Sequence, residues 1–111
     1  MKKNRYIYPA IFNYNSNGIT VEFPDILGCF TSGDTQEEAL EMAKEAMALH
    51  MVELEKEHFE IPVATSLHKL KTVANQATVL VDVWMPPYRQ GLNSPHVKEI
   101  LSTPRWLISP K

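Results

Sequence analysis

The histidine and cysteine side chains of this 111-residue chain are the groups most able to act as metal ligands, bases or nucleophiles. No two histidines have the i, i+4 spacing of a metal site on a helix; the four are His50, His58, His68 and His96. The single cysteine, Cys29, has β-branched and aromatic neighbours, which is typical of a buried structural thiol. One cysteine cannot form an internal disulfide, which favours a reducing compartment. We therefore expect no catalytic group, no metal and no cofactor.

Acidic side chains gather in residues 34–60, where nine carboxylates stand against only Lys44 and Lys56. Two interpretations are open: a hydrated outer face of a helix, or an electrostatic field that attracts a basic partner. A further carboxylate, Asp25, follows Pro24 in a predicted turn, where it either accepts hydrogen bonds from local backbone amides or contacts a partner. The candidate partner-binding residues are Asp25, Glu37, Glu38, Glu41 and Glu45.

Basic side chains lie near both ends of the chain. Residues 1–60 carry 5 basic and 11 acidic side chains, whereas residues 61–111 carry 6 basic and 2 acidic ones, so the formal net charge of −2 hides opposite halves. Basic groups interleaved with Tyr6, Trp84 and Trp106 are typical of phosphate contact and base stacking. The candidate nucleic-acid-binding residues are Lys2, Lys3, Arg5, Arg89, Lys98 and Arg105.

One long helix must carry the acidic residues. Thr35 followed by Glu38 predicts a capping box at its start, and carboxylates in the first turn suit the positive end of the helix dipole. Apolar residues recur at helical spacing from Ala39 to Leu54, and they predict an amphipathic helix that ends near Lys56.

Four strands are predicted around this helix: residues 5–13, 19–23, 29–32 and 76–84. Asn17-Gly18 predicts a hairpin between the first two, and Pro9 places its side of the first strand at an edge or a bulge. Residues 63–75 are either a short helical turn or a loop. We expect a right-handed crossover to return the fourth strand parallel to one of the others. The resulting fold class is α+β, a two-layer sandwich.

The C-terminal part differs in composition from the rest. Residues 86–96 hold three prolines and a glycine, which is typical of a connector, and residues 97–107 predict one further strand. We therefore expect a domain at residues 1–85 and a connector with a short irregular tail at residues 86–111. Neither a membrane helix nor a signal peptide is predicted, which places the protein in the cytoplasm.

Three strings in the first 40 residues resemble the HicB antitoxin family of bacterial toxin–antitoxin systems. They read Tyr8-Pro9-Ala10-Ile11-Phe12, then Phe23-Pro24-Asp25-Ile26-Leu27-Gly28-Cys29, then Thr31-x-Gly33-Asp34-Thr35-x-Glu37-Glu38-Ala39-Leu40. Ile26-Leu27 stands where the family usually has leucine-proline. The likeness continues through residues 42–46, the Ile61-Pro62 pair and residues 79–83, so that it covers about residues 6–83.

The resemblance implies a partial ribonuclease-H-like fold of strand-strand-strand-helix-strand order. It also implies an antitoxin that binds and neutralises a HicA-type mRNA-cleaving toxin, a small ribonuclease with a double-stranded-RNA-binding-like fold. The acidic helix would then attract this basic toxin and cover its phosphate site. Relatives usually carry a C-terminal DNA-binding segment that represses their own operon. Residues 97–107 are similar to the strand of a ribbon-helix-helix, and we expect residues 86–111 to hold a truncated remnant of one.

A ribonuclease-H-like fold also raises the question of nuclease activity. Two-metal phosphodiester chemistry needs several converging carboxylates, and residues 5–13 contain neither Asp nor Glu. We therefore expect a non-catalytic protein. Binding of operator DNA or RNA by the basic residues stays as the alternative function. A sheet face left uncovered by a single helix is expected to pair with another copy, which gives a homodimer or a tetramer.

Overall fold

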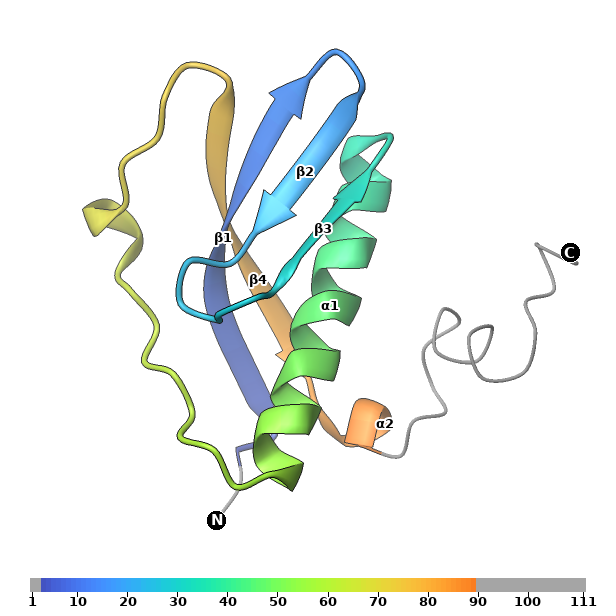
Figure 1. Cartoon of the computed structure of the whole chain (residues 1–111), viewed down its shortest axis with the longest axis vertical. Coiled ribbons are helices and arrows are strands. Elements are labelled where there is room, and N and C mark those ends of the chain that lie inside the picture. Colours follow the sequence, from blue (N-terminus) through green and yellow to red (C-terminus); the bar gives the residue numbers. More distant parts are fainter. Residues whose placement is uncertain (1–2, 90–111) are drawn as a thin grey trace, which may run out of the picture.

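One long helix packs against one face of a four-stranded sheet (Figure 1). The structure, a computed structural model, describes residues 3–89. Its strands are β1 (Arg5–Asn15), β2 (Gly18–Glu22), β3 (Phe30–Gly33) and β4 (Gln76–Trp84), in the sheet order β3-β2-β1-β4. The helices are α1 (Gln36–Lys56) and the single turn α2 (Pro86–Arg89), and Leu67–Lys69 form a 3₁₀ turn, η1. The predicted α+β class is confirmed.

The core lies between α1 and the sheet face that carries every second residue of β1. The hydroxyl of Tyr6 reaches Glu55 of α1, so this face is the one the helix covers. Small side chains on α1 let the helix approach the sheet closely. The buried residues of this layer are Tyr6, Tyr8, Ala10 and Phe12 of β1, Val81 and Val83 of β4, and Ala39, Ala43, Met47, Ala48 and Met51 of α1.

The predicted hairpin is confirmed, with β1 two residues longer than expected. Asn15 pairs with Gly18 across a two-residue connection, and Gly18 has a φ of 134° that an L side chain rarely adopts. The last pair between β1 and β2 joins Ile11 to Glu22, so Pro9 lies beyond the end of β2. Its missing N–H therefore costs no ladder hydrogen bond on that side, as the sequence predicted.

The prediction of a fourth strand that pairs in parallel is wrong. β4 pairs antiparallel with β1, from Arg5 opposite Trp84 to Asn13 opposite Gln76. The physical reason is the length of the segment at residues 57–75. It runs back along the sheet to the end where α1 begins (Figure 1), so β4 starts at that end and runs against β1.

Residues 86–89, which the sequence assigned to the connector, pack against the domain. Tyr88 is partly buried on the core, and its amide donates to the carbonyl of Met85. The predicted strand at residues 97–107 and the ribbon-helix-helix remnant lie outside the described residues.

The backbone of α1 lies close to the sheet at the end of β3. A Cβ on Gly33 would lie 2.5 Å from the backbone nitrogen of Ala39. We therefore predict that Gly33→Ala lowers the free energy of unfolding by about 1–3 kcal/mol, because the helix has to move away from the strand. Urea denaturation followed by circular dichroism measures the loss. The matched control is Ser32→Ala at the exposed neighbouring position, and equal stability of the two variants would contradict this packing.

Candidate partner-binding surfaces

An acidic surface lies at the start of α1, where Asp34 precedes the helix and Glu37, Glu38 and Glu41 lie in its first two turns; all four are exposed. The capping residues hold it in place. The amide of Glu38 donates to Thr35 Oγ1 at 3.1 Å, and the Glu38 carboxylate accepts from the amide of Asp34 at 2.7 Å. The predicted start of the helix is therefore confirmed, and the negative charges lie where the helix dipole stabilises them.

Glu45, predicted as part of the same partner-binding face, is buried, with 7% of its surface exposed. It lies near Tyr88 of α2, whose pKa is raised mainly by burial and then by the charges of Glu45 and Glu41. The sequence grouped Glu45 with the carboxylates of the partner-binding face. The packing of residues 86–89 against α1 corrects that placement, and Glu45 is not part of the acidic surface.

Asp25 holds two loops together. Its carboxylate accepts from the Thr65 amide at 2.8 Å and from the Thr65 hydroxyl at 2.6 Å. Nearby, the hydroxyl of Tyr8 donates to the carbonyl of Pro62 at 2.6 Å, and the pKa of Tyr8 is raised by burial and then by the charge of Asp25. The prediction of hydrogen bonds from local backbone amides is wrong, because the amide and the hydroxyl that bond to Asp25 both belong to Thr65, 40 positions away.

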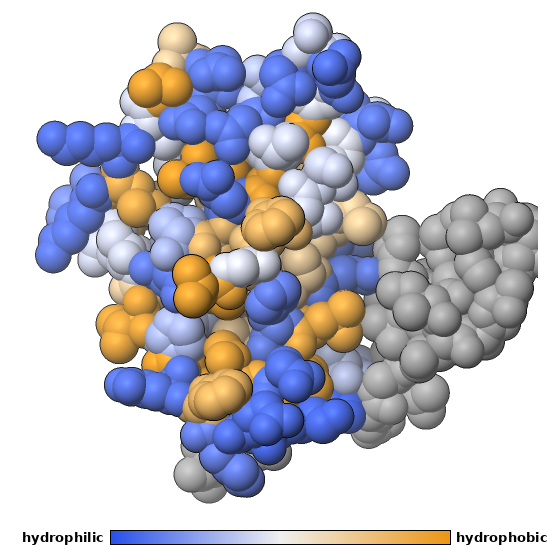
Figure 2. Space-filling view, in the orientation of Figure 1, coloured by the Kyte–Doolittle hydropathy of each residue, from blue (hydrophilic) through white to orange (hydrophobic). Residues whose placement is uncertain are grey.

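The joined loops carry exposed apolar side chains that the sequence analysis missed. Leu27 is 98% exposed at the tip of the loop between β2 and β3, and Val63 is exposed on the segment that Asp25 holds. Figure 2 shows apolar residues reaching the surface at several separate places between hydrophilic ones. The sequence did contain a signal for this exposure. Leu27 is a large apolar residue that stands between Asp25 and Gly28, in a stretch with turn residues.

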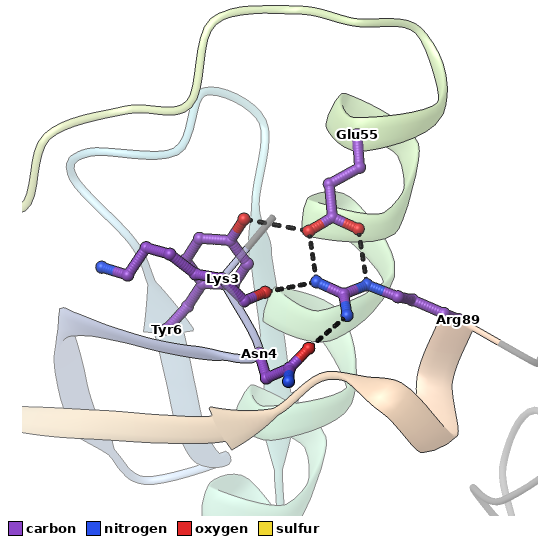
Figure 3. Close-up of polar contacts among 5 residues, drawn as sticks. All are labelled: Lys3, Asn4, Tyr6, Glu55 and Arg89. Atoms are coloured by element: carbon purple, nitrogen blue, oxygen red, sulfur yellow. Dashed lines mark hydrogen bonds and ion pairs between the residues drawn. The ribbon is translucent and has the colours of Figure 1, made fainter. Parts of the chain in front are cut away.

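The guanidinium of Arg89, a candidate nucleic-acid contact, forms hydrogen bonds with other residues of this chain (Figure 3). Its Nε and Nη2 donate to the two carboxylate oxygens of Glu55, both at 2.9 Å, and its Nη1 donates to Asn4 Oδ1 at 2.7 Å. Nη2 also donates to the carbonyl of Lys3. Tyr6 adds a third hydrogen bond to Glu55, at 2.9 Å. Glu55 is 8% exposed, so this bidentate pair offsets the cost of burying its charge.

The other basic candidates divide into two groups. Arg5 forms a bidentate pair with Asp82 at 2.8 and 2.9 Å, on the sheet face away from α1. Lys3 lies 5.7 Å from the ring centre of Tyr6 and is exposed. The remaining candidates, Lys2, Lys98 and Arg105, lie outside the described residues.

Two of the side chains most capable of chemistry, Cys29 and His50, have structural surroundings. Cys29 is a buried free thiol, and burial raises its pKa to about 12, which confirms the predicted structural thiol. His50 Nδ1 lies 3.0 Å from the carbonyl of Ala46 on the same helix. Within residues 3–89, no group of three His, Cys, Asp or Glu side chains is placed to hold a metal ion. Neither helix of that range has the length and hydropathy to span a membrane.

A protein-family model matches most of the chain. The model of the HicB_like antitoxin of bacterial toxin-antitoxin systems matches residues 8–98. Among curated proteins, Antitoxin HicB 2 of Photorhabdus laumondii is 49% identical over 47 residues, which are 42% of this chain and 33% of that protein. The matched stretch spans less than half the length of the curated relatives.

Several solved structures share the fold, and two of them are chains of toxin-antitoxin complexes. A chain of a HicA3 and HicB3 toxin-antitoxin complex is 30% identical, with a TM-score of 0.56 over 74% of this chain and 100% of that chain. A chain of a toxin-antitoxin complex from Streptococcus pneumoniae is 24% identical, with a TM-score of 0.71 over 94% of this chain and 84% of that chain. At that lower identity, the second likeness shows the fold alone.

The pair of Arg89 and Glu55 generates a stability prediction. Arg89→Met removes the cation and leaves the buried carboxylate of Glu55 without its bidentate partner, so we expect a loss of roughly 2–4 kcal/mol in the free energy of unfolding. Arg5→Met is the control, because its ion pair with Asp82 is solvent-exposed and should contribute little. Chemical denaturation of both variants makes the comparison, and equal effects would contradict the importance of the buried pair.

The thiol of Cys29 generates a second prediction. A pKa of about 12 leaves very little thiolate in the folded protein at mildly alkaline pH, so we expect modification by a maleimide to be at least ~100-fold slower in the folded than in the guanidinium-unfolded protein. Timed alkylation followed by mass spectrometry measures both rates. Rapid modification of the folded protein would show that the thiol is accessible.

Proposed function

The chain belongs to the HicB_like antitoxin family of bacterial toxin–antitoxin systems, and from this membership we propose that it binds and neutralises a HicA-type toxin. The family match over residues 8–98 is the observation that carries the proposal. The solved complex of HicA3 and HicB3 supports it, because one of its chains shares this fold over its whole length.

We propose the acidic surface as the contact for the toxin. Exposed Glu37, Glu38 and Glu41 lie together on the first two turns of α1, with the backbone fixed by the Thr35 cap. A mRNA-cleaving partner has to bind phosphates through basic side chains, so a carboxylate surface is complementary to its substrate site. Neutralisation would follow because the protein occupies the site that the RNA needs.

The protein is proposed to act by binding and not by catalysis. Three carboxylates on or near the sheet have intramolecular partners: Asp25 bonds to Thr65, Asp82 to Arg5 and Glu55 to Arg89. The raised pKa of Cys29 keeps that thiol protonated at neutral pH. A free thiol is also the state expected in the cytoplasm, where we place the protein.

Nucleic-acid binding is weaker as an alternative function. Arg5 and Arg89 bind carboxylates of this chain, so their charges are not available to phosphates without breaking those pairs. No contact among residues 3–89 favours this function over the toxin-binding one.

A charge-reversal pair tests the proposed surface. Glu37→Lys with Glu41→Lys leaves the capping residue Glu38 intact, and we expect it to slow association with a HicA-type toxin at low salt by roughly tenfold or more. The control is Glu53→Lys with Glu57→Lys, which changes the net charge equally at exposed positions near the other end of α1. Stopped-flow or biolayer measurements give the association rates, and thermal unfolding checks that both variants fold.

Three outcomes decide between the interpretations. A selective effect of the first pair supports the acidic surface as the contact. Equal slowing by both pairs would show that only overall charge matters, which contradicts the proposed location. Failure of the unmodified protein to co-purify with a co-expressed toxin of this type would contradict the function itself.

A further inference from the structure

The outer strand β4 presents a backbone edge whose direction follows from two hydrogen bonds. The amide of Tyr14 donates to the carbonyl of Asn75, and the amide of Met85 donates to the carbonyl of Asn4. In the observed register, these bonds show that residues 75 and 85 point their backbone N–H and C=O groups toward β1. Backbone groups alternate along a strand, so odd-numbered residues of β4 face β1. Thr78, Leu80 and Asp82 therefore point their N–H and C=O groups away from the sheet.

This edge lacks the features that usually prevent an edge strand from pairing with a strand of another chain. It is nine residues long, rich in β-branched side chains and free of proline from Gln76 to Trp84. Its single charged residue, Asp82, has its carboxylate paired with Arg5. Leu80 and Trp84 are more than half exposed on the same face. A long apolar edge of this kind is a template for pairing with another strand.

The charges beside the edge favour a partner other than a basic protein. A groove of about 620 Å³ runs along β4, and its charged lining residues are Arg5, Lys44 and Asp82. Cations therefore outnumber the one carboxylate, so a basic partner is not attracted there. A second copy of this chain presents a strand of the same length, and the one charged residue of that strand, Asp82, is likewise paired with Arg5. The two strands can therefore overlap fully with no unpaired charge on either one.

We propose that β4 pairs antiparallel with β4 of a second copy of this chain, so that two four-stranded sheets become one continuous sheet. Leu80 is the midpoint of β4. A twofold axis at Leu80 overlaps the whole strand and places outward-facing residues opposite one another, as an antiparallel ladder requires. In this register Thr78 lies opposite Asp82 of the second copy, so no like charges meet directly. The pairing uses the strand edge, and it is independent of the proposed toxin contact.

A proline substitution tests the ladder selectively. Leu80→Pro removes an outward-facing N–H and leaves the pairing with β1 intact, since Val79 and Val81 make that ladder. Analytical ultracentrifugation of the full chain should show a dimer, and Leu80→Pro should raise its dissociation constant roughly 100-fold, because two symmetry-related hydrogen bonds are lost. Leu80→Ala keeps the N–H and should have a clearly smaller effect. A monomeric unmodified protein, or a dimer that the proline leaves unchanged, overturns the proposal.

A cross-linking experiment keeps the proposal testable if the proline variant fails to fold. Leu80→Cys places two thiols on the twofold axis, where opposed Cα atoms of a hydrogen-bonded pair are about 5.5 Å apart, within disulfide range. We expect mild oxidation to give a covalent dimer of the full chain. Thr20→Cys, at an exposed position of β2 on the same sheet face, is the control. Equal cross-linking of the Leu80→Cys and Thr20→Cys variants overturns the pairing. The pairing is also overturned if the Leu80→Pro variant loses toxin binding while its dimer stays unchanged.

Discussion

A single helix has to cover a four-stranded sheet, and most features of this protein follow from that constraint. α1 buries one face of the sheet through small residues such as Ala39 and Ala43, and Gly33 allows the backbone of α1 to lie close to β3. Nothing of comparable length covers the other face within residues 3–89, so Leu80 and Trp84 remain exposed there. α1 ends at the end of the sheet opposite to the one where β4 begins, so residues 57–75 run back along the sheet to reach that point (Figure 1).

The returning segment and the C-terminal turn need polar anchors because they bury little apolar surface. Asp25 holds the segment through Thr65, and Arg89 holds α2 through Glu55. In each contact the carboxylate accepts several hydrogen bonds or is paired with a cation. A carboxylate can be buried at low cost only when it has such partners. These carboxylates therefore have structural roles, although in a sequence they look the same as the exposed ones on α1.

Local signals in the sequence predicted local structure well. The Thr35 and Glu38 pair, the hairpin signal at Asn17-Gly18 and the apolar stripe of α1 depend on residues a few positions apart. The cap, the hairpin and the helix that they predict are all confirmed. Glu45 and Arg89 were misplaced because their surroundings depend on residues more than 30 positions away. The direction of β4 was wrong for the same reason, since a periodicity argument cannot tell whether residues 57–75 cross the sheet once or return along it.

The two proposed surfaces differ in what can bind to them. Carboxylates at Glu37 and Glu41 repel the same carboxylates of another copy, so the acidic surface disfavours self-association and leaves that region open to a basic partner. Backbone groups at the β4 edge carry almost no selectivity, but the strand's length and its neutral centre suit an identical strand. Like-charge repulsion on α1 and backbone pairing at β4 thus direct two kinds of partner to two places. A dimer formed through β4 would keep an acidic surface on each copy, and each copy could then bind one toxin.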